Sequence, residues 1–450
     1  MLETGVHVSF ISFERGYKSV MTNQKLHTFY EFHTSLENYQ IHKFNQMLSF
    51  LMVENEFYKN KLEGIRLPIR SKKELAQLPF TTKQELVNDQ KNNLPYGKNH
   101  TYPVSSYGRY HQTSGTTGEP LKVLDTPKSW NWWEECWKKV YDASHVTSED
   151  IVFLAFSFGP FVGFWGGFEA AKKISALVIS SGSQSSKERI TSMMNNNATV
   201  LLCTPSYALR LIEVAEEMGA DLHDTSIEKI ITAGEPGGSI PSIRKQIEDG
   251  WDATVYDHVG MTEMGAYGYG CDAKNGLHIN DEQFIAEIIN PETGEPVGAN
   301  ERGELVLTNL GRYGYPLIRY RTGDMVINQP EGCTCGDSFT FLPGGLLGRA
   351  DDMVVIRGIN IYPSSIEAIV REYKEIKEFR IVYYTEDDMD QIKVQIETDN
   401  EAIRDELYTL LRQRVGLRIN TEIVENGTLP RFEMKAKRIL DDREKRTAIS

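Results

Sequence analysis

The sequence contains no long apolar run and few cysteines. No stretch of about 18 apolar residues occurs, and the first residues lack a basic segment followed by an apolar core and a cleavage site. We therefore expect a cytoplasmic protein that does not contact membranes. Five cysteines are few and odd in number, which excludes a disulfide framework. This small number is consistent with a reducing compartment. In such a compartment, clustered cysteines are more typical of metal binding than of disulfides.

The chain also lacks an excess of positive charge. Its formal net charge is −14, and the basic stretch 435–446 is interrupted by acidic residues. A nucleic acid would meet no general attraction, so we exclude it as a partner. Any polyphosphate ligand must be held by local donors or a metal. The apolar (40%) and charged (25%) fractions are those of a globular protein, and 450 residues allow two or three domains.

One stretch, His111 to Lys122, is rich in hydroxyl residues and glycine. It reads HQTSGTTGEPLK. Its glycines allow positive φ, so that successive N–H groups and hydroxyls can converge on one anion. The spacing is not that of the P-loop, and Glu119 stands where the P-loop lysine is expected. Taken alone, the stretch is equally typical of an ordinary polar turn.

The pattern of apolar residues changes twice along the chain. Over 151–260, apolar runs alternate with helical stretches, which predicts a parallel sheet covered on both faces. After Ile279, alternation broken by turns predicts antiparallel hairpins. Helical spacing over 25–75 predicts N-terminal helices, and Thr81 or Thr82 is predicted to cap the helix that follows.

We therefore predict an α/β protein with two domains. The large domain covers 1–348, with a helical cap over 1–75 and a small antiparallel β-rich part over 280–348. An α+β domain covers 349–450, with the candidate hinge at 349–352. Ligands of parallel sheets bind beyond the carboxyl ends of the strands. These ends are rich in glycine, hydroxyl and acidic residues at 156–159, 180–182, 204–206, 233–237 and 257–263.

Six short motifs occur in the order found in adenylate-forming enzymes. They are TSGTTGEP (113–120), AGEP (233–236), GMTE (260–263), YRTGD (320–324), GRADD (348–352) and LPRFEMKAKR (429–438). PFTTK (79–83) and DMVVIRGINIYPSSIE (352–367) are especially close to one branch. From about residue 40 onward, the chain resembles the phenylacetate-CoA ligase family of acyl-CoA synthetases. The resemblance implies that the C-terminal domain is mobile.

The resemblance also implies ATP-dependent activation of a small carboxylic acid. The carboxylate attacks the α-phosphorus of ATP, pyrophosphate leaves, and the thiol of CoA converts the acyl-adenylate to a thioester. Because both partners of the first step are anionic, Mg²⁺ and a lysine are the expected tools. Two alternatives remain on the same scaffold: transfer to a carrier-protein thiol or an amine, and a non-catalytic nucleotide sensor. A homodimer is a further expectation from the family.

The resemblance implies roles for individual residues. Lys435 would bridge the substrate carboxylate and the α-phosphate, with Lys437 as the less favoured candidate. Glu263 would bind Mg²⁺, and Asp351 would be the hinge. The residues expected to hold the nucleotide are Thr113, Ser114, Gly115, Thr116, Thr117, Gly118, Gly234, Glu235, Pro236, Asp257, His258, Thr262, Asp324 and Arg349.

One departure from the family pattern concerns the adenine. The family usually places an aromatic residue before the glycine of its GMTE-like motif, and here that residue is Val259. Losing a stack between base and ring costs about 1–3 kcal/mol. We keep ATP as the nucleotide and expect Val259, helped by His258, to pack on the adenine.

The acid is the least determined substrate. Residues 156–168, FSFGPFVGFWGGF, combine aromatic rings with glycines, which suits a flat ring, although core packing explains them equally well. We expect an aryl or arylacetic acid, with a short aliphatic acid as the alternative. The predicted acid pocket comprises Phe156, Phe158, Phe161, Tyr207, Gly260 and Met264.

Three cysteines and a histidine form a second candidate site: Cys271, His278, Cys333 and Cys335. This set suits a closed tetrahedral Zn²⁺ site, although the C-x-C spacing is tighter than the usual C-x₂-C. Since all four ligands would come from the protein, we expect a structural role. The alternatives are buried polar residues beside a hairpin tip, and a strained disulfide between Cys333 and Cys335.

Overall fold

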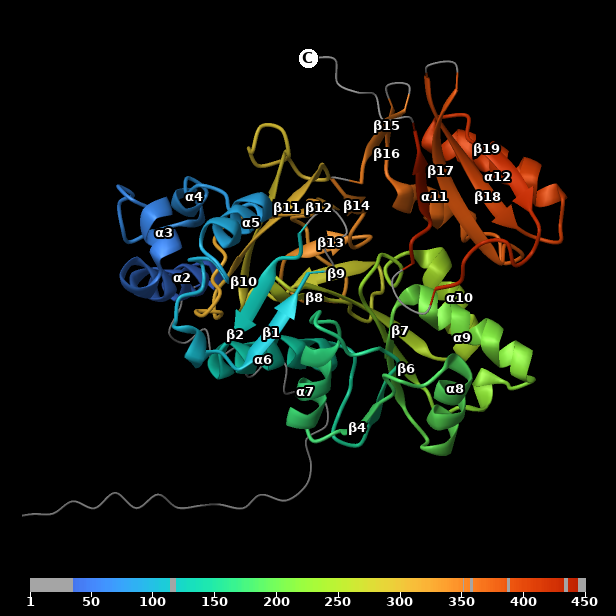
Figure 1. Cartoon of the computed structure of the whole chain (residues 1–450), viewed down its shortest axis with the longest axis horizontal. Helices are drawn as coiled ribbons and strands as arrows, with labels where there is room; N and C mark the ends of the chain where they lie inside the picture. The colour runs from blue at the N-terminus through green and yellow to red at the C-terminus, as the bar shows by residue number, and fades with distance from the viewer. Residues whose placement is uncertain are drawn as a thin grey trace, which may run out of the picture.

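The structure is a computed structural model that describes residues 35–113, 119–350, 352–356, 359–386, 389–432 and 436–443. Figure 1 shows a large body and a smaller C-terminal unit that lies against it beside α10 (Pro241–Trp251). Within these ranges, none of the helices is both long and apolar enough to cross a membrane.

A mixed eight-stranded sheet forms the centre of the large body. Its strands are β3 (Ile151–Leu154), β4 (Leu177–Ser180), β5 (Val200–Cys203), β6 (Lys229–Thr232), β7 (Thr254–Met261), β8 (Gly265–Tyr269), β9 (Gly276–Ile279) and β13 (Phe341–Pro343). They are ordered β13-β9-β8-β7-β6-β5-β3-β4. The pairs from β4 to β7 are parallel, as predicted, and the pairs from β7 to β13 are antiparallel.

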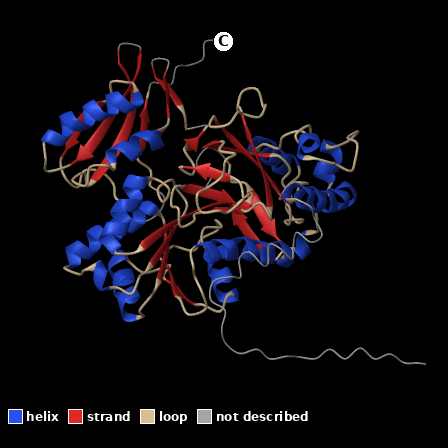
Figure 2. Cartoon of the chain, turned by 180° about the vertical axis from the view of Figure 1, so that it is seen from behind, coloured by secondary structure: helices blue, strands red, loops and turns tan. Residues whose placement is uncertain are grey.

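Helices cover both faces of this sheet (Figure 2). They are α6 (Pro127–Ala143), α7 (Trp165–Lys173), α8 (Ser186–Asn195), α9 (Pro205–Met218) and α10. Alternate residues of a strand point to opposite faces. Val152 and Leu154 accordingly share a core with Trp137 of α6, whereas Phe153 shares another with Leu211 of α9. Burial on both faces explains why these strands are continuous apolar runs.

An antiparallel sheet lies beside the central one, as the hairpin pattern predicted. Its strands, in order, are β10 (Phe284–Ile289), β11 (Arg302–Asn309), β12 (Tyr320–Ile327) and β14 (Gly348–Arg349). The N-terminal helices α2 (Leu36–Glu54), α3 (Glu56–Lys61) and α4 (Lys72–Leu75) share a core with Ile285 of β10, whereas Leu86 of α5 (Lys83–Asn92) belongs to the core that contains Trp137. The part of the predicted helical cap before residue 35 lies outside the described residues.

The segment after the N-terminal helices leads toward the glycine-threonine stretch. Thr82 caps α5 in a capping box with Glu85, whereas Thr81 is buried and bridges to Tyr320 of β12. A two-stranded ribbon of β1 (Arg109–Gln112) and β2 (Lys122–Asp125) brackets the glycine-threonine stretch. Two short 3₁₀ helices complete the large body, η1 (Val104–Ser106) and η2 (Leu222–Asp224).

The C-terminal unit is an α+β structure with its own core. It contains β15 (Val354–Ile356), β16 (Ile359–Ile361), α11 (Pro363–Val370), β17 (Glu378–Glu386), β18 (Met389–Glu397), α12 (Ala402–Val415), β19 (Asn420–Val424) and β20 (Ile439–Asp442). The four-stranded sheet has the order β19-β18-β17-β20. β20, which pairs in parallel with β17, falls in the basic stretch 435–446, for which the sequence predicts no strand. The division at 348/349 stays a prediction.

Candidate active site

A cavity of about 940 Å³ lies between the carboxyl ends of the central strands and the C-terminal unit. Its wall contains residues from all six motifs noted in the sequence. The predicted site residues that line it are Thr113, Phe156, Phe161, Gly234, Glu235, Pro236, Asp257, His258, Gly260, Thr262, Glu263, Asp324 and Arg349. The fold therefore brings together, in one place, most of the described residues that the sequence singled out.

Three residues predicted to line the acid pocket lie elsewhere. Phe158 packs on Trp165, with ring centroids 4.5 Å apart. Tyr207 is buried in the core beneath α9, where its hydroxyl is 2.9 Å from that of Ser186, and Met264 is fully buried in the other core. These side chains stabilise the cores and do not reach the cavity wall. The predicted residues that lie outside the described ones are Ser114, Gly115, Thr116, Thr117, Gly118, Asp351 and Lys435.

Asp324 is a buried carboxylate at one side of the cavity. It lies opposite Arg349 in the pairing of β12 with β14, and the Arg349 guanidinium is 3.4 Å from its Oδ1. The hydroxyl of Tyr267 donates to Oδ2 at 3.0 Å. Burial and the Asp324 charge raise the pKa of Tyr267 well above its usual range, so the phenol stays a donor. Tyr267 was not identified from the sequence.

Glu263 sits in a turn that a buried arginine holds in place. Arg312 Nη1 donates to the carbonyl oxygens of Thr262 and Glu263 at 2.9 and 2.8 Å. The same guanidinium binds Asp125 through Nε and Nη2 at 2.8 and 2.5 Å. Both side chains are buried, with exposed fractions of 1% and 0%. The sequence did not identify Arg312 and Asp125 as partners, because they lie 187 positions apart in the chain.

The Glu263 side chain retains capacity for a cation. Its Oε1 lies 3.5 Å from Lys83 Nζ and 3.4 Å from the Tyr320 hydroxyl, and both contacts are long. A buried carboxylate with two weakly engaged partners suits a hard cation such as Mg²⁺. Lys83 belongs to the PFTTK motif, so the sequence contained a signal for its proximity that we did not use.

Asp257 is a partly buried acid of the cavity wall with several hydrogen-bond donors around it. Ser239 donates to its Oδ2 at 2.6 Å, and the backbone N–H of His258 donates to its Oδ1 at 3.1 Å. Burial raises the pKa of Asp257 to about 6. Val259 also lines the cavity, at the position where the family pattern has an aromatic ring.

The other end of the cavity is lined by aromatic rings. Phe156 packs edge-on against Phe161 and Phe164, with centroid distances of 5.4 and 5.1 Å. Trp137 of α6 packs against His258, with centroids 4.2 Å apart. The glycines of this segment make room for the rings, since a Cβ on Gly163 would lie 2.2 Å from the ring of Phe156.

The C-terminal unit reaches the cavity through a short segment. Ala436 donates its backbone N–H to Glu235 Oε2 at 3.0 Å, while Glu235 Oε1 accepts from Ser206 N at 2.8 Å. Arg438 binds the hydroxyl of Ser206 at 2.9 Å. Glu235 therefore contacts the C-terminal unit through Oε2, while its Oε1 is held within the large body. Lys437, the less favoured catalytic candidate, is exposed and does not line the cavity.

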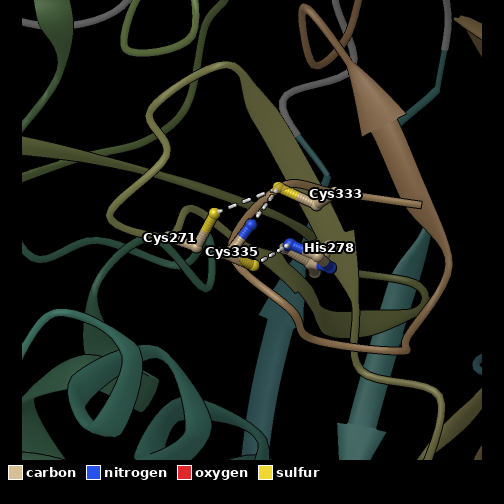
Figure 3. Close-up of side chains that lie close together, drawn as sticks. All are labelled: Cys271, His278, Cys333 and Cys335. Carbon is tan, nitrogen blue, oxygen red and sulfur yellow. Dashed lines mark hydrogen bonds between the residues drawn. The ribbon is translucent and has the colours of Figure 1, made fainter.

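Cys271, His278, Cys333 and Cys335 converge from three segments (Figure 3). Their candidate ligand atoms all lie within 4.8 Å of one another. The sulfurs of Cys271 and Cys333 are 3.7 Å apart, and Cys335 Sγ is 3.3 Å from His278 Nε2. Ligands around tetrahedral zinc would be separated by about 3.5–3.8 Å. The two distances are close to those between zinc ligands, and Cys271, Cys333 and Cys335 are all free thiols in this structure.

Comparisons with known families match most of the chain. The family model described as AMP-binding enzyme matches residues 110–311, and the one described as AMP-binding enzyme C-terminal domain matches residues 358–443. A phenylacetate-coenzyme A ligase of Pseudomonas putida is 30% identical over 388 residues, which cover 82% of this chain and 85% of that protein. A phenylacetate-coenzyme A ligase of Thermus thermophilus is 27% identical over 432 residues, which cover 89% of this chain and 95% of that protein.

Solved structures of a 2-hydroxyisobutyryl-CoA ligase resemble this one. In the postadenylation state with an acyl-AMP, that enzyme gives a TM-score of 0.85 at 27% identity, covering 90% of this chain and 89% of the other. With CoA in the thioesterification state, it gives 0.67 at 28% identity and the same coverage. The two parts of this chain are therefore arranged more nearly as in the postadenylation state.

Replacing Arg312 by leucine should destabilise the protein by about 3–5 kcal/mol, because Asp125 would remain buried without its partner. Urea denaturation followed by circular dichroism measures this change. Arg210→Gln, which breaks a partly exposed pair with Glu213, is the control and should cost less than about 1 kcal/mol. Asp125→Leu combined with Arg312→Leu should recover part of the loss. Equal effects of Arg312→Leu and Arg210→Gln would contradict this role.

The raised pKa of Asp257 predicts a pH dependence. Between the unfolded value near 4 and the folded value of about 6, the folded protein holds a proton that the unfolded chain releases, so stability falls as pH rises. Between these two pH values, the unfolding free energy of the wild type should fall by about 2–3 kcal/mol more than that of Asp257→Asn, which has no carboxyl group at this position. Denaturation of both proteins from pH 4 to pH 7 tests it. The exposed Asp224→Asn variant should track the wild type, and a pH-independent difference for Asp257→Asn would be evidence against the shift.

Proposed function

The chain belongs to the phenylacetate-CoA ligase family of AMP-forming enzymes, and from this premise we propose that it converts an aryl or arylacetic acid to its CoA thioester. The reaction uses ATP and proceeds through an acyl-adenylate. One observation carries the proposal: a single cavity is lined both by residues of the sequence motifs and by a set of aromatic rings.

The motif end of the cavity holds the nucleotide. Asp324 accepts the ribose hydroxyls, a bidentate contact that suits a carboxylate, and Arg349 beside it contacts ribose or phosphate. Gly234, Pro236, Asp257 and Val259 frame the adenine. The hydroxyl and N–H groups that begin at Thr113 hold the β- and γ-phosphates, and Glu263 holds Mg²⁺. Bound there, Mg²⁺ neutralises phosphate charge.

The first step joins the acid to AMP. A carboxylate oxygen of the substrate attacks the α-phosphorus, the bond from that phosphorus to the bridging oxygen breaks, and pyrophosphate leaves. Lys435 neutralises the meeting anions. Ala436, the next residue in the chain, contacts Glu235 and lines the cavity, which supports this role.

The second step transfers the acyl group to CoA. The thiolate attacks the acyl carbonyl carbon, the bond to the AMP oxygen breaks, and AMP leaves with that electron pair. We propose that the C-terminal unit rotates about Asp351 between the steps. The contacts of Ala436 and Arg438 with the large body break in this rotation. They are few and polar, which supports a movable contact.

The acid lies at the aromatic end of the cavity. Phe156, Phe161, Phe164 and Trp137 form a slot whose edge-on rings suit a flat substrate. The curated relatives are named for phenylacetate, which supports an arylacetic acid. A short aliphatic acid remains the alternative, because the similar structures are those of a 2-hydroxyisobutyryl-CoA ligase.

The cysteine and histidine cluster holds a structural Zn²⁺ in this proposal. His278 Nδ1 lies 3.4 Å from the carbonyl oxygen of Phe339, which leaves Nε2 to face the sulfurs. The donor set is soft and closed. The metal would join the strand that follows the Glu263 turn to the loop before β13.

Pyrophosphate release is the test of the proposed function. With ATP and Mg²⁺, release should depend on an added acid, respond most to aryl and arylacetic members of a panel, and increase with CoA, with a thioester as product. Release that CoA does not affect would indicate transfer to a carrier thiol or an amine. Absence of release with every acid would contradict the ligase proposal and favour a nucleotide sensor.

Lys435→Ala should reduce acid-dependent pyrophosphate release by at least ~100-fold, because adenylation loses its positioned charge. Lys437→Ala is the matched control, since this exposed lysine lies two residues away and should change the rate by less than about threefold. Equal rates for Lys435→Ala and the wild type would show that the lysine assignment is wrong.

Purified protein should contain one zinc ion per chain, measured by inductively coupled plasma mass spectrometry. Cys333→Ser should lose the metal and lower the melting temperature. Cys136→Ala removes a buried cysteine outside the cluster and should keep the zinc. A metal-free wild type, purified without chelator, would refute this assignment.

A further inference from the structure

His258 commits one ring nitrogen to the protein and leaves the other available. Its Nδ1 lies 2.7 Å from the carbonyl oxygen of Gly268. Because a carbonyl oxygen only accepts, Nδ1 carries the hydrogen and Nε2 presents a lone pair. Burial lowers the pKa of His258 to about 4, which keeps the ring neutral near pH 7. Among the residues that the structure describes, none donates a hydrogen bond to Nε2.

The available nitrogen belongs to the aromatic end of the cavity. Successive side chains of β7 point to opposite faces, so His258 faces away from Asp257 and packs against Trp137. A Cβ on Gly260 would lie 3.4 Å from Nε2 and 2.9 Å from the carbonyl oxygen of Gly265, so the glycine lets the backbone approach closely beside the ring. The side chain is 95% buried and still lines the cavity.

Nε2 faces the cavity, so a bound acid that fills this space without offering a donor leaves the acceptor unpaired, and an acid that supplies a donor there gains selectivity. The neighbouring Trp137, Phe156 and Phe164 carry no charge. A hydroxyl donates a hydrogen bond without bringing a charge that must be desolvated. The chemistry around Nε2 therefore favours a hydroxyl.

We propose that the acid substrate carries a hydroxyl group that donates a hydrogen bond to Nε2 of His258. The proposal rests on the proposed ligase function and narrows its substrate class to hydroxylated carboxylic acids. His258 is thus a specificity-determining residue of the acid pocket, in place of the adenine contact that the family pattern suggested.

Pairs of acids that differ only by hydroxyl and methyl test the proposal. Suitable pairs are 4-hydroxyphenylacetate with 4-methylphenylacetate, mandelate with 2-phenylpropionate, and lactate with isobutyrate. In acid-dependent pyrophosphate release, the hydroxylated member of at least one pair should have a kcat/KM about tenfold or more above its partner. Equal or better use of every methyl member would overturn the proposal.

Binding separates this proposal from the ligase function itself. The acyl-sulfamoyl adenosine analogues of the same pairs need no turnover, and calorimetry gives their affinities. Tighter binding of a hydroxylated analogue by about tenfold supports the proposal even where no acid releases pyrophosphate. If methyl-substituted acids support pyrophosphate release and neither assay shows a preference for hydroxylated acids, the ligase function stands and the hydroxyl proposal is rejected.

Variants assign the preference to the ring nitrogen. His258→Leu should lower the hydroxyl preference by about tenfold, while His258→Gln, whose amide oxygen accepts, should retain most of it. His100→Leu is the matched control: His100 also has Nδ1 at a carbonyl, 2.8 Å from Tyr96 O, but lies outside the cavity wall. It should leave the preference unchanged. An unaltered preference in His258→Leu would overturn the proposal, and if that variant does not fold, the wild-type pairs and His258→Gln still decide.

Discussion

The buried ion pair between Asp125 and Arg312 is the interaction on which the geometry of the site depends. Asp125 ends β2, and β2 pairs with β1 on either side of the glycine-threonine stretch. Arg312 also holds two carbonyl groups of the turn that presents Glu263. One guanidinium therefore fixes the proposed phosphate stretch and the proposed magnesium ligand relative to each other. Desolvating two charges is costly, and the bidentate contact plus two backbone bonds offset that cost.

Contacts between the two parts of the chain are of a different kind. The Glu235 carboxylate spans Ser206 and Ala436, and Arg438 joins Ser206 to the acidic side chains of its own unit. These contacts are directional hydrogen bonds. The rotation that we propose between the two steps would break these hydrogen bonds and leave the ion pair of the large body in place.

The sequence predicted the fold well because its periodicity is a local property. Each apolar run over 151–260 became a strand, and the motifs met at the carboxyl ends of those strands, as strand direction requires. Side-chain direction was harder to predict. Tyr207 and Met264 follow strand ends but turn into the cores, because position along a chain does not tell which way a side chain points. The ion pair of Arg312 with Asp125 could not be predicted from the sequence, because no local pattern links the two residues. The described residues contain no Lys435, so its role stays a prediction.

The pleat of β7 separates two tasks that neighbouring residues perform. Asp257 faces the proposed adenine side and His258 the proposed acid side, although one peptide bond joins them. A mutation at one position leaves the side-chain contacts of the other largely intact. The acid preference of such a chain can therefore drift during evolution, or be redesigned, while the machinery for the nucleotide is inherited unchanged.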